Sequence, residues 1–321
     1  MLAVLFFVII AVMRVIQSVG GKRASIEVKE MKTFFCYGVY YEALAAVIGL
    51  ISVAITGFKG LNEPTVICGA VTAVFLMINF YASLNAVKGC KLIVSAMASN
   101  GGMVIACFVS SFWFGESIGV LQYIGLVLFL AAAYLLSSVP KAAEVGEKKK
   151  ISKGTWVLLA VVMLSEGGVE VSQKYFSVRV GGNSAWFSFF MFAVSAAIMA
   201  VGLIRETIKE RGLNGCLIAE SGAENLASDK KATGGERARK GGLNKTLYIC
   251  GALLATAVFV VNLLITELGK TINTVVLFPV SASIGICITV LVGWIVYKEK
   301  LTAKNIVGVA AGLCAVILLA I

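Results

Sequence analysis

Long apolar runs alternate with short polar segments along most of this chain. Each run has about 20 residues, the length that an α-helix needs to cross the hydrocarbon core of a bilayer. Because a backbone in lipid must satisfy its own hydrogen bonds, we expect these runs to be helices. The pattern predicts ten helices, with boundaries good to about 2–4 residues, at 2–20, 33–56, 65–86, 91–113, 119–139, 155–174, 184–204, 246–267, 273–296 and 302–321.

Two polar segments interrupt this pattern. Residues 140–153 are basic, and residues 205–245 are rich in Gly, Lys, Arg, Glu and Ala. The centre of the second segment has almost no aliphatic or aromatic residues, so we expect a mobile loop there, with its first residues extending the preceding helix. The predicted organisation is therefore a first five-helix repeat in 1–140, a basic connecting loop in 141–153, and a second five-helix repeat in 154–321 that contains the mobile loop 205–245.

The two units resemble each other at an offset of 183 residues. Ten of the 58 positions in 79–136 are identical to their counterparts, and six of these ten are aliphatic. An odd number of helices in each unit inverts the second unit relative to the first, and inverted repeats are typical of transporters. The informative matches are the polar residues and glycines: Asn79 with Asn262, Gly102 with Gly285, Glu116 with Glu299, and Gly125 with Gly308.

Composition and charge support a membrane location and suggest an orientation. Hydrophobic residues make up 59% of the chain and charged residues 14%, against about 25% charged residues in soluble domains. Of the 28 Lys and Arg residues, 23 fall in odd-numbered connections between the predicted helices and four in even-numbered ones. The positive-inside rule then places 21–32, 140–153 and 205–245 in the cytoplasm and both termini outside. We expect a multi-pass plasma membrane protein whose net charge of +11 reflects topology rather than nucleic-acid binding.

The close of each unit carries a family resemblance. The segments FGESIGVLQYIGLVLFLAAAYLL and YKEKLTAKNIVGVAAGLCAVILL resemble the end of each half in the EamA family of the drug/metabolite transporter superfamily. Pro279 is similar to the proline that often opens the ninth helix there. The resemblance implies a ten-helix carrier with a central cavity between two inverted five-helix repeats. The chain departs from the family in its predicted outside termini and in Ala96, which stands where the second half has Pro279.

Ionisable residues within the predicted helices are the first candidates for a functional site, because each costs about 2.5–3.5 kcal/mol to insert into a bilayer. Glu166 and Glu170 are four residues apart and share one helix face, which Gln173 extends. Such a carboxylate pair suits proton exchange or cation binding, whereas Glu170 near a helix end would simply reach water. Arg14 aligns with Glu166 when the first and sixth helices are superposed at their final lysines. Arg14 then forms a salt bridge, holds an anionic substrate, or extends to the membrane surface.

Further polar residues lie in the second, third and eighth predicted helices. Glu42 near mid-helix and Tyr41 beside it form an acidic and aromatic wall that suits a flat or cationic ligand. The alternative is a belt of tyrosines at the membrane interface. Asn79 and Asn262 either cross-link neighbouring helices or line a cavity, together with Tyr81, Ser83 and Thr266.

The repeated acids and the proline have a structural interpretation. Glu116 and Glu299 lie in tight turns, where we expect each to cap the N-terminus of the next helix. Pro279 is grouped with these repeat turns because the resemblance to the EamA family implies a proline that opens a helix. The chain has no histidine, and its eight cysteines are scattered without a C-x-x-C pair. We therefore expect no metal site and no cofactor.

These patterns favour a secondary-active transporter of small metabolites or organic compounds that works by alternating access, with proton coupling as one option. No phosphate-binding loop is present to use ATP, and we do not expect an enzyme. Its partners would be the small-molecule substrate, the lipid bilayer and, in a homodimer, a second copy of the chain. The alternatives are a membrane-embedded enzyme or flippase for lipid-linked substrates, and a substrate-gated receptor that signals through 205–245.

Overall fold

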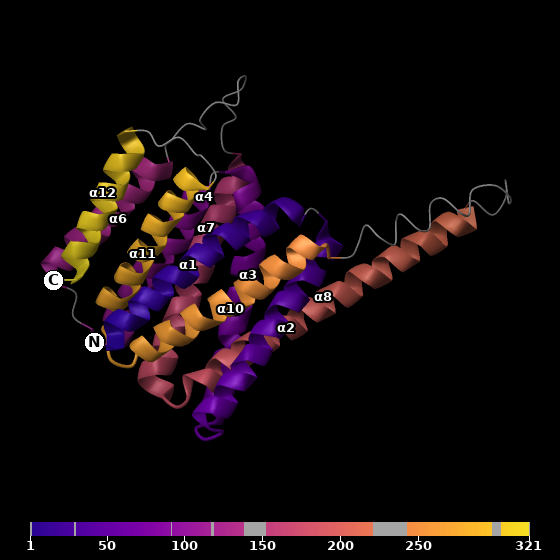
Figure 1. The fold of residues 1–321 in the computed structure, drawn as a ribbon, viewed down its shortest axis with the longest axis horizontal. Coiled ribbons are helices and arrows are strands. Elements are labelled where there is room, and N and C mark those ends of the chain that lie inside the picture. Colours follow the sequence, from indigo (N-terminus) through magenta and orange to yellow (C-terminus); the bar gives the residue numbers. More distant parts are fainter. Residues whose placement is uncertain are drawn as a thin grey trace.

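All the regular structure that is described is helical (Figure 1). The structure is a computed structural model that describes residues 2–28, 30–90, 92–116, 119–137, 152–220, 243–296 and 303–320. The helices are α1 (Leu2–Glu27), α2 (Met31–Thr56), α3 (Glu63–Gly89), α4 (Leu92–Asn100), α5 (Gly102–Trp113), α6 (Val120–Ser137), α7 (Lys153–Tyr175), the π-helical turn η1 (Phe176–Val180), α8 (Ser184–Glu220), α10 (Lys245–Leu268), α11 (Thr274–Ile295) and α12 (Ala303–Ala320).

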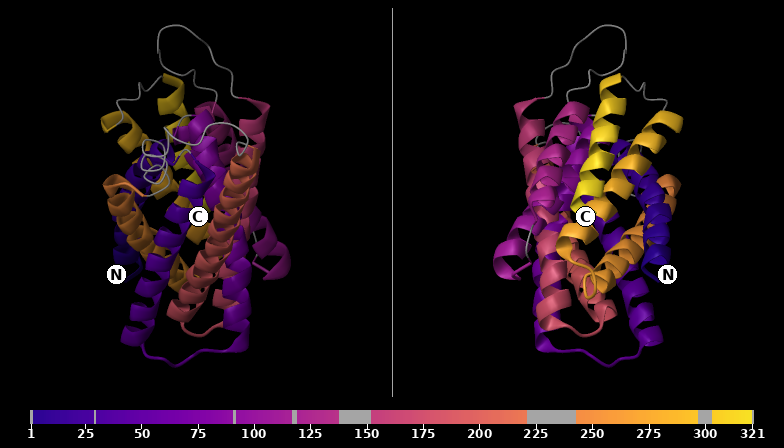
Figure 2. Two further views of the ribbon diagram at one scale, coloured as in Figure 1. Left: turned by 90° about the vertical axis from the view of Figure 1, so that its right-hand side faces the viewer. Right: turned by 90° about the vertical axis from the view of Figure 1, so that its left-hand side faces the viewer.

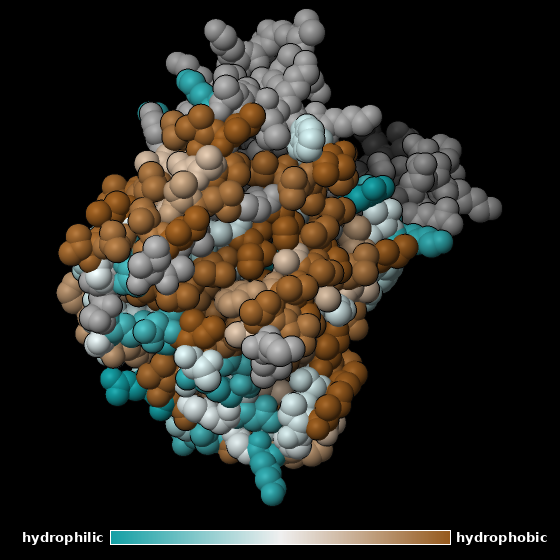
Figure 3. Space-filling view, turned by 60° about the vertical axis from the view of Figure 1, so that its left-hand side comes forward, coloured by the Kyte–Doolittle hydropathy of each residue, from teal (hydrophilic) through white to brown (hydrophobic). Residues whose placement is uncertain are grey.

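Seven helices in the described ranges are long and apolar enough to cross a membrane. They are Ala3–Glu27, Met31–Thr56, Glu63–Gly89, Lys153–Val180, Ser184–Glu210, Lys245–Leu268 and Thr274–Ile295, and Val120–Ala132 and Ile306–Ala315 are shorter apolar stretches. The expected all-helical architecture is thus confirmed for the described residues and is consistent with a multi-pass membrane protein, while the number of ten crossings stays a prediction. Figure 3 shows the matching surface, with apolar side chains over most of one face and hydrophilic ones gathered toward its lower edge.

Side-chain caps begin three of the helices. Asn62, Ser152 and Asn244 each accept a hydrogen bond from the backbone N–H three residues later, at 2.9–3.2 Å. Asn and Ser are favoured at this position because they satisfy N–H groups that have no partner within the helix. These polar residues, rather than the apolar runs alone, set where α3, α7 and α10 begin.

The predicted single helix over 91–113 is wrong in one respect. It is divided into α4 and α5 at Gly101, which keeps helical dihedral angles (φ −63°, ψ −21°). A Cβ on the neighbouring Gly102 would lie 2.6 Å from the backbone nitrogen of Gly167. Gly102 therefore lets α7 approach the backbone at the α4–α5 junction more closely than a residue with a side chain would allow.

Three helices extend beyond their expected ends. α1 continues to Glu27, so Lys22 lies in a helix rather than in the connection where its charge was counted. α7 continues through Lys174 into η1, and this lysine is likewise helical. α8 continues through the predicted extension at 205–211 and ends at Glu220, projecting away from the bundle (Figure 1). Most of the expected connecting loop, and 221–242 of the expected mobile loop, lie outside the described residues.

The proline expected at a helix start lies elsewhere. Pro279 is inside α11, in its second turn. Its carbonyl accepts a hydrogen bond of 2.8 Å from Ser283 Oγ. Proline lacks a backbone N–H, so Pro279 removes one hydrogen bond from within α11 and does not open the helix.

The helices pack in an order that pairs early elements with late ones. α2 packs against α8, and α6 packs against α12 (Figures 1 and 2). The other principal contacts are α1 with α10 and α11, α3 with α7 and α8, α2 with α10, α7 with α4 and α5, α11 with α4, α5 and α12, and α4 with α6. One apolar cluster forms around Phe129 and Phe278, and a second around Tyr37 and Phe192.

Candidate functional site

A cavity of about 270 Å³ lies inside the bundle, lined mainly by α1, α2, α3, α7 and α10. This volume is close to the lower end of small-molecule sites. Eight of the sequence-predicted site residues, which come from all five of these helices, lie in the cavity wall, whereas Tyr81 and Thr266 do not. The eight are Arg14, Tyr41, Glu42, Asn79, Glu166, Glu170, Gln173 and Asn262. A role in substrate binding remains a prediction for each.

Arg14 and the two acids of α7 form the charged part of the wall. Both Glu166 and Glu170 act electrostatically on Arg14, yet within the described chain no ion pair of 4.0 Å or less joins them. Arg14 Nη1 instead donates a hydrogen bond of 3.1 Å to Gln17 Oε1. Arg14 Nε and Glu170 Oε2 are buried and have no hydrogen-bond partner among the described residues. The group is thus close but not locked into a direct salt bridge.

The two glycines that follow Glu166 explain how α7 fits between its neighbours. A Cβ on Gly167 would meet Ile105 of α5 at 2.8 Å, and a Cβ on Gly168 would meet the ring of Phe75 in α3 at 2.5 Å. The close approach that these two glycines allow is thus made by α5 and α3. The glycine side of α7 therefore packs against α3 and α5, and the side that carries Glu166 and Glu170 lines the cavity.

The amide side chains both line the cavity and cross-link helices. Gln173 Nε2 donates to Asn262 Oδ1 at 2.6 Å and joins α7 to α10. Asn79 Nδ2 donates to the carbonyl of Val162 at 3.2 Å and joins α3 to α7. The two interpretations of these asparagines are therefore compatible with each other. Tyr81, in contrast, is 44% exposed on the outside of the bundle and is not part of the wall.

A buried polar cluster lies beyond one end of the cavity, where Lys174 follows the lining residue Gln173 on α7. Lys174 Nζ is 2.9 Å from Glu116 Oε1 and donates to the carbonyls of Gly269 and Ile272 at 3.2 and 3.1 Å. These three acceptors match the three N–H groups of an ammonium. Glu116 Oε2 accepts a hydrogen bond of 3.0 Å from the backbone N–H of Thr274. We call this group of Glu116, Lys174 and the turn between α10 and α11 the polar seal.

The polar seal corrects two expectations. Glu116 does cap a helix, but the helix is α11 rather than α6, which follows it in sequence. Its side chain is only 13% exposed and does not face bulk water. Lys174 ends the predicted helix 155–174 and is one of the four charges counted with the even-numbered connections, whereas its side chain is only 4% exposed. The spacing offered a signal, because Lys174 lies four residues after Glu170 and so shares its face of α7. Glu299, the repeat counterpart of Glu116, lies outside the described residues.

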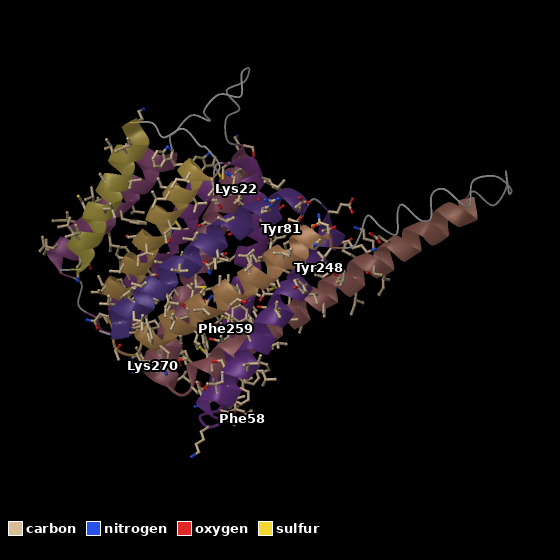
Figure 4. All side chains as sticks on the ribbon, in the orientation of Figure 1. Lys22, Phe58, Tyr81, Tyr248, Phe259 and Lys270 are labelled. Carbon is tan, nitrogen blue, oxygen red and sulfur yellow. The ribbon has the colours of Figure 1, made fainter. Side chains whose placement is uncertain are left out.

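The cavity opens at the opposite end. Lys22, Ser25 and Val87 line both the cavity and a neighbouring surface depression that reaches Lys88. Arg14 precedes Lys22 by eight residues and so lies about 12 Å deeper at 1.5 Å per residue. Figure 4 shows Lys22 at the end of the bundle opposite Lys270. The open end therefore carries the odd-numbered connections, and the polar seal lies toward the even-numbered ones.

Comparisons with known proteins define the fold more than the function. No family model matches the sequence, and no curated protein matches it significantly. One solved structure, named only "Crystal structure of protein", is similar to it with a TM-score of 0.59 over 98% of this chain and 95% of its own, at 11% sequence identity. At this identity the similarity supports a shared fold alone.

Proposed function

We propose that this chain is a secondary-active transporter of small organic compounds that works by alternating access. The observation that carries the proposal is the cavity itself, which lies within an apolar bundle, has Arg14, Glu42, Glu166 and Glu170 in its wall, and reaches the surface near Lys22. The polar seal lies beyond its other end, where Lys174 follows the lining residue Gln173. Buried ionisable groups inside a membrane are costly and mark substrate or ion pathways. The cavity and seal together have the form expected of a carrier with one of its two gates closed.

Helix packing supports an architecture of two inverted five-helix repeats, as the resemblance to the EamA family implies. In that architecture α1, α2, α3, α4 with α5, and α6 correspond to α7, α8, α10, α11 and α12. Exchanging the two sets converts the α1–α10 contact into α7–α3 and the α2–α10 contact into α8–α3. It also converts α1–α11 into contacts of α7 with α4 and α5, and α4–α6 into α11–α12. The pairs α2–α8 and α6–α12 map onto themselves, as they should about a pseudo-two-fold axis.

The proposed mechanism moves the two repeats relative to each other around the cavity. In the state described here substrate enters from the end near Lys22. Breaking the polar seal while the open end closes would expose the same cavity to the other side. Substrate shifts this equilibrium only through its different affinity for the two states. By the positive-inside rule, the end near Lys22 lies on the cytoplasmic side of the plasma membrane.

Transport by reconstituted protein tests the proposal. A thermal-shift screen of purified protein identifies compounds that bind the folded state, and radiolabelled hits are then offered to proteoliposomes. We expect uptake of at least one hit above that of protein-free vesicles. If no stabilising compound crosses the membrane in either direction, the transporter proposal is wrong.

Glu166→Gln separates coupling from folding. The variant keeps the size of the side chain but cannot exchange a proton, so uptake driven by a pH gradient should be abolished while the protein still inserts. Glu63→Gln is the matched control, because Glu63 is exposed in the first turn of α3 and should leave uptake unchanged. Normal pH-driven uptake by Glu166→Gln would remove this residue from the coupling mechanism.

A further inference from the structure

Glu42 is a buried carboxylate whose two oxygens have no hydrogen-bond partner among the described residues. It lies near the middle of α2, its residue exposure is 0%, and it lines the cavity. No Lys or Arg of the described chain forms an ion pair with it within 4.0 Å. Burying a carboxyl group without hydrogen-bond partners costs free energy, unless a ligand supplies hydrogen-bond donors or a positive charge.

Aromatic rings form the wall beside this acid. Tyr37, Tyr41 and Phe80 line the same cavity and stack on one another with centroids 5.5–6.3 Å apart and interplanar angles of 12–21°. The Tyr37 hydroxyl is also buried with no partner in the described structure. Faces of aromatic rings attract cations, so the charge of the acid and the quadrupoles of the rings favour the same ligand group.

The other acids of the cavity are in a different situation. Glu166 and Glu170 interact electrostatically with Arg14, which supplies one positive charge for the pair. Glu42 has no comparable electrostatic interaction with Arg14, and its side chain is fully buried. Among the three acids of the cavity, Glu42 is therefore the one that interacts with no positively charged side chain of the described chain, and it lies beside the aromatic rings.

We propose that Glu42, with Tyr37, Tyr41 and Phe80, forms a subsite for the positively charged nitrogen of an organic cation with an apolar or aromatic body. This inference rests on the proposed function and names the substrate class of its cavity. A protonated amine supplies both the charge and the N–H donors that Glu42 lacks. A neutral molecule of the same shape supplies no charge, and an anion would be repelled by Glu42, Glu166 and Glu170.

Calorimetric binding to the purified full-length protein tests the subsite with three probes of one shape: benzylammonium, benzyl alcohol and benzoate. We expect benzylammonium to bind about 10- to 100-fold more tightly than benzyl alcohol, the range for a hydrogen bond to a charged group, and benzoate not to bind. Glu42→Gln should weaken benzylammonium by a similar factor. Glu63→Gln, which removes an exposed carboxylate in the first turn of α3 outside the cavity wall, is the matched control and should change the affinity by less than about threefold.

Two measurements keep the test independent of folding. Glu42→Gln replaces a buried carboxyl group that has no hydrogen-bond partner in the described chain with an amide of similar size, so its thermal melting without ligand should be close to or above the wild-type value. Phe80→Leu removes one ring and should weaken benzylammonium several-fold while leaving benzyl alcohol nearly unchanged. Wild-type affinity of Glu42→Gln for benzylammonium, or equal binding of benzyl alcohol, would overturn the subsite.

The same probes distinguish failure of the subsite from failure of the transport proposal. If benzylammonium binds in a Glu42-dependent way but proteoliposomes take up neither it nor any other ligand, the subsite stands and transport is refuted. If the vesicles transport another compound while benzylammonium does not bind, transport stands and the cation subsite is refuted.

Discussion

The polar seal gives a quantitative prediction about how the closed end is held. Lys174 and Glu116 are 2.9 Å apart and 4% and 13% exposed. At an effective dielectric constant of about 20 their attraction is about 6 kcal/mol, part of which offsets their desolvation. Removing one partner of a buried pair costs about 3–5 kcal/mol because the other charge is left uncompensated.

A double-mutant cycle should therefore show strong coupling between the two side chains. We expect Lys174→Met to lower the free energy of unfolding by about 3–4 kcal/mol. Glu116→Gln should cost about 3 kcal/mol, because the Lys174 ammonium keeps two backbone carbonyls as acceptors. The double variant should be less destabilised than the sum by about 2–3 kcal/mol. The measurement is reversible unfolding in mixed micelles, followed by tryptophan fluorescence.

An exposed ion pair of the same chemistry provides the control. Lys32 and Glu210 are 2.6 Å apart but 31% and 48% exposed. Solvent screening limits such pairs to about 0–1 kcal/mol, so Lys32→Met should change the free energy of unfolding by less than that amount. If the changes for Lys174 and Glu116 simply add, or are as small as that of Lys32→Met, the two residues do not form a buried, interdependent seal.

Two further predictions concern packing and orientation. Gly102→Ala should destabilise the protein by about 1–3 kcal/mol, because its Cβ would lie 2.6 Å from the Gly167 backbone nitrogen, whereas Gly21→Ala, with no atom within 4 Å, should not; equal melting temperatures of the two variants would contradict the close contact between α5 and α7. In a cysteine-free background, a thiol at the exposed Lys59 should react with an impermeant reagent added to intact cells, and one at the exposed Lys209 should not. Labelling of Lys209→Cys alone would reverse the proposed orientation.

The sequence was most informative about where polar side chains converge. A polar group within an apolar run has few acceptable surroundings, so each such residue is a strong constraint on its own. This reasoning selected Arg14, Glu42 and Glu166 from three different helices, and the structure places all three in one cavity wall. Tyr81 was a weaker inference because a tyrosine is also stable at the membrane interface, and it lies on the outside.

Contacts between distant segments were the part that the sequence could not provide. A carboxylate in a turn is naturally assigned to the next helix, yet Glu116 caps α11, whose first residue is 158 positions later. Lys174 was counted with the connections because it ends an apolar run, and only the tertiary fold provides its carboxylate and carbonyl partners. Helix boundaries were also difficult to predict from the sequence, since the α4–α5 junction depends on the approach of Gly167 from another helix.

Helix α7 carries charges that its proposed repeat counterpart, α1, does not carry. One stripe of α7 holds Glu166, Glu170 and Gln173 in the cavity wall, and then Lys174 in the polar seal. In the proposed two-repeat architecture α1 corresponds to α7, and it contributes Arg14 to the wall. A tilt or rotation of α7 that moves its carboxylates relative to Arg14 must also move Lys174 relative to Glu116, because both groups lie on one continuous helix. Under the proposed function, α7 therefore couples occupancy of the cavity to opening of the seal.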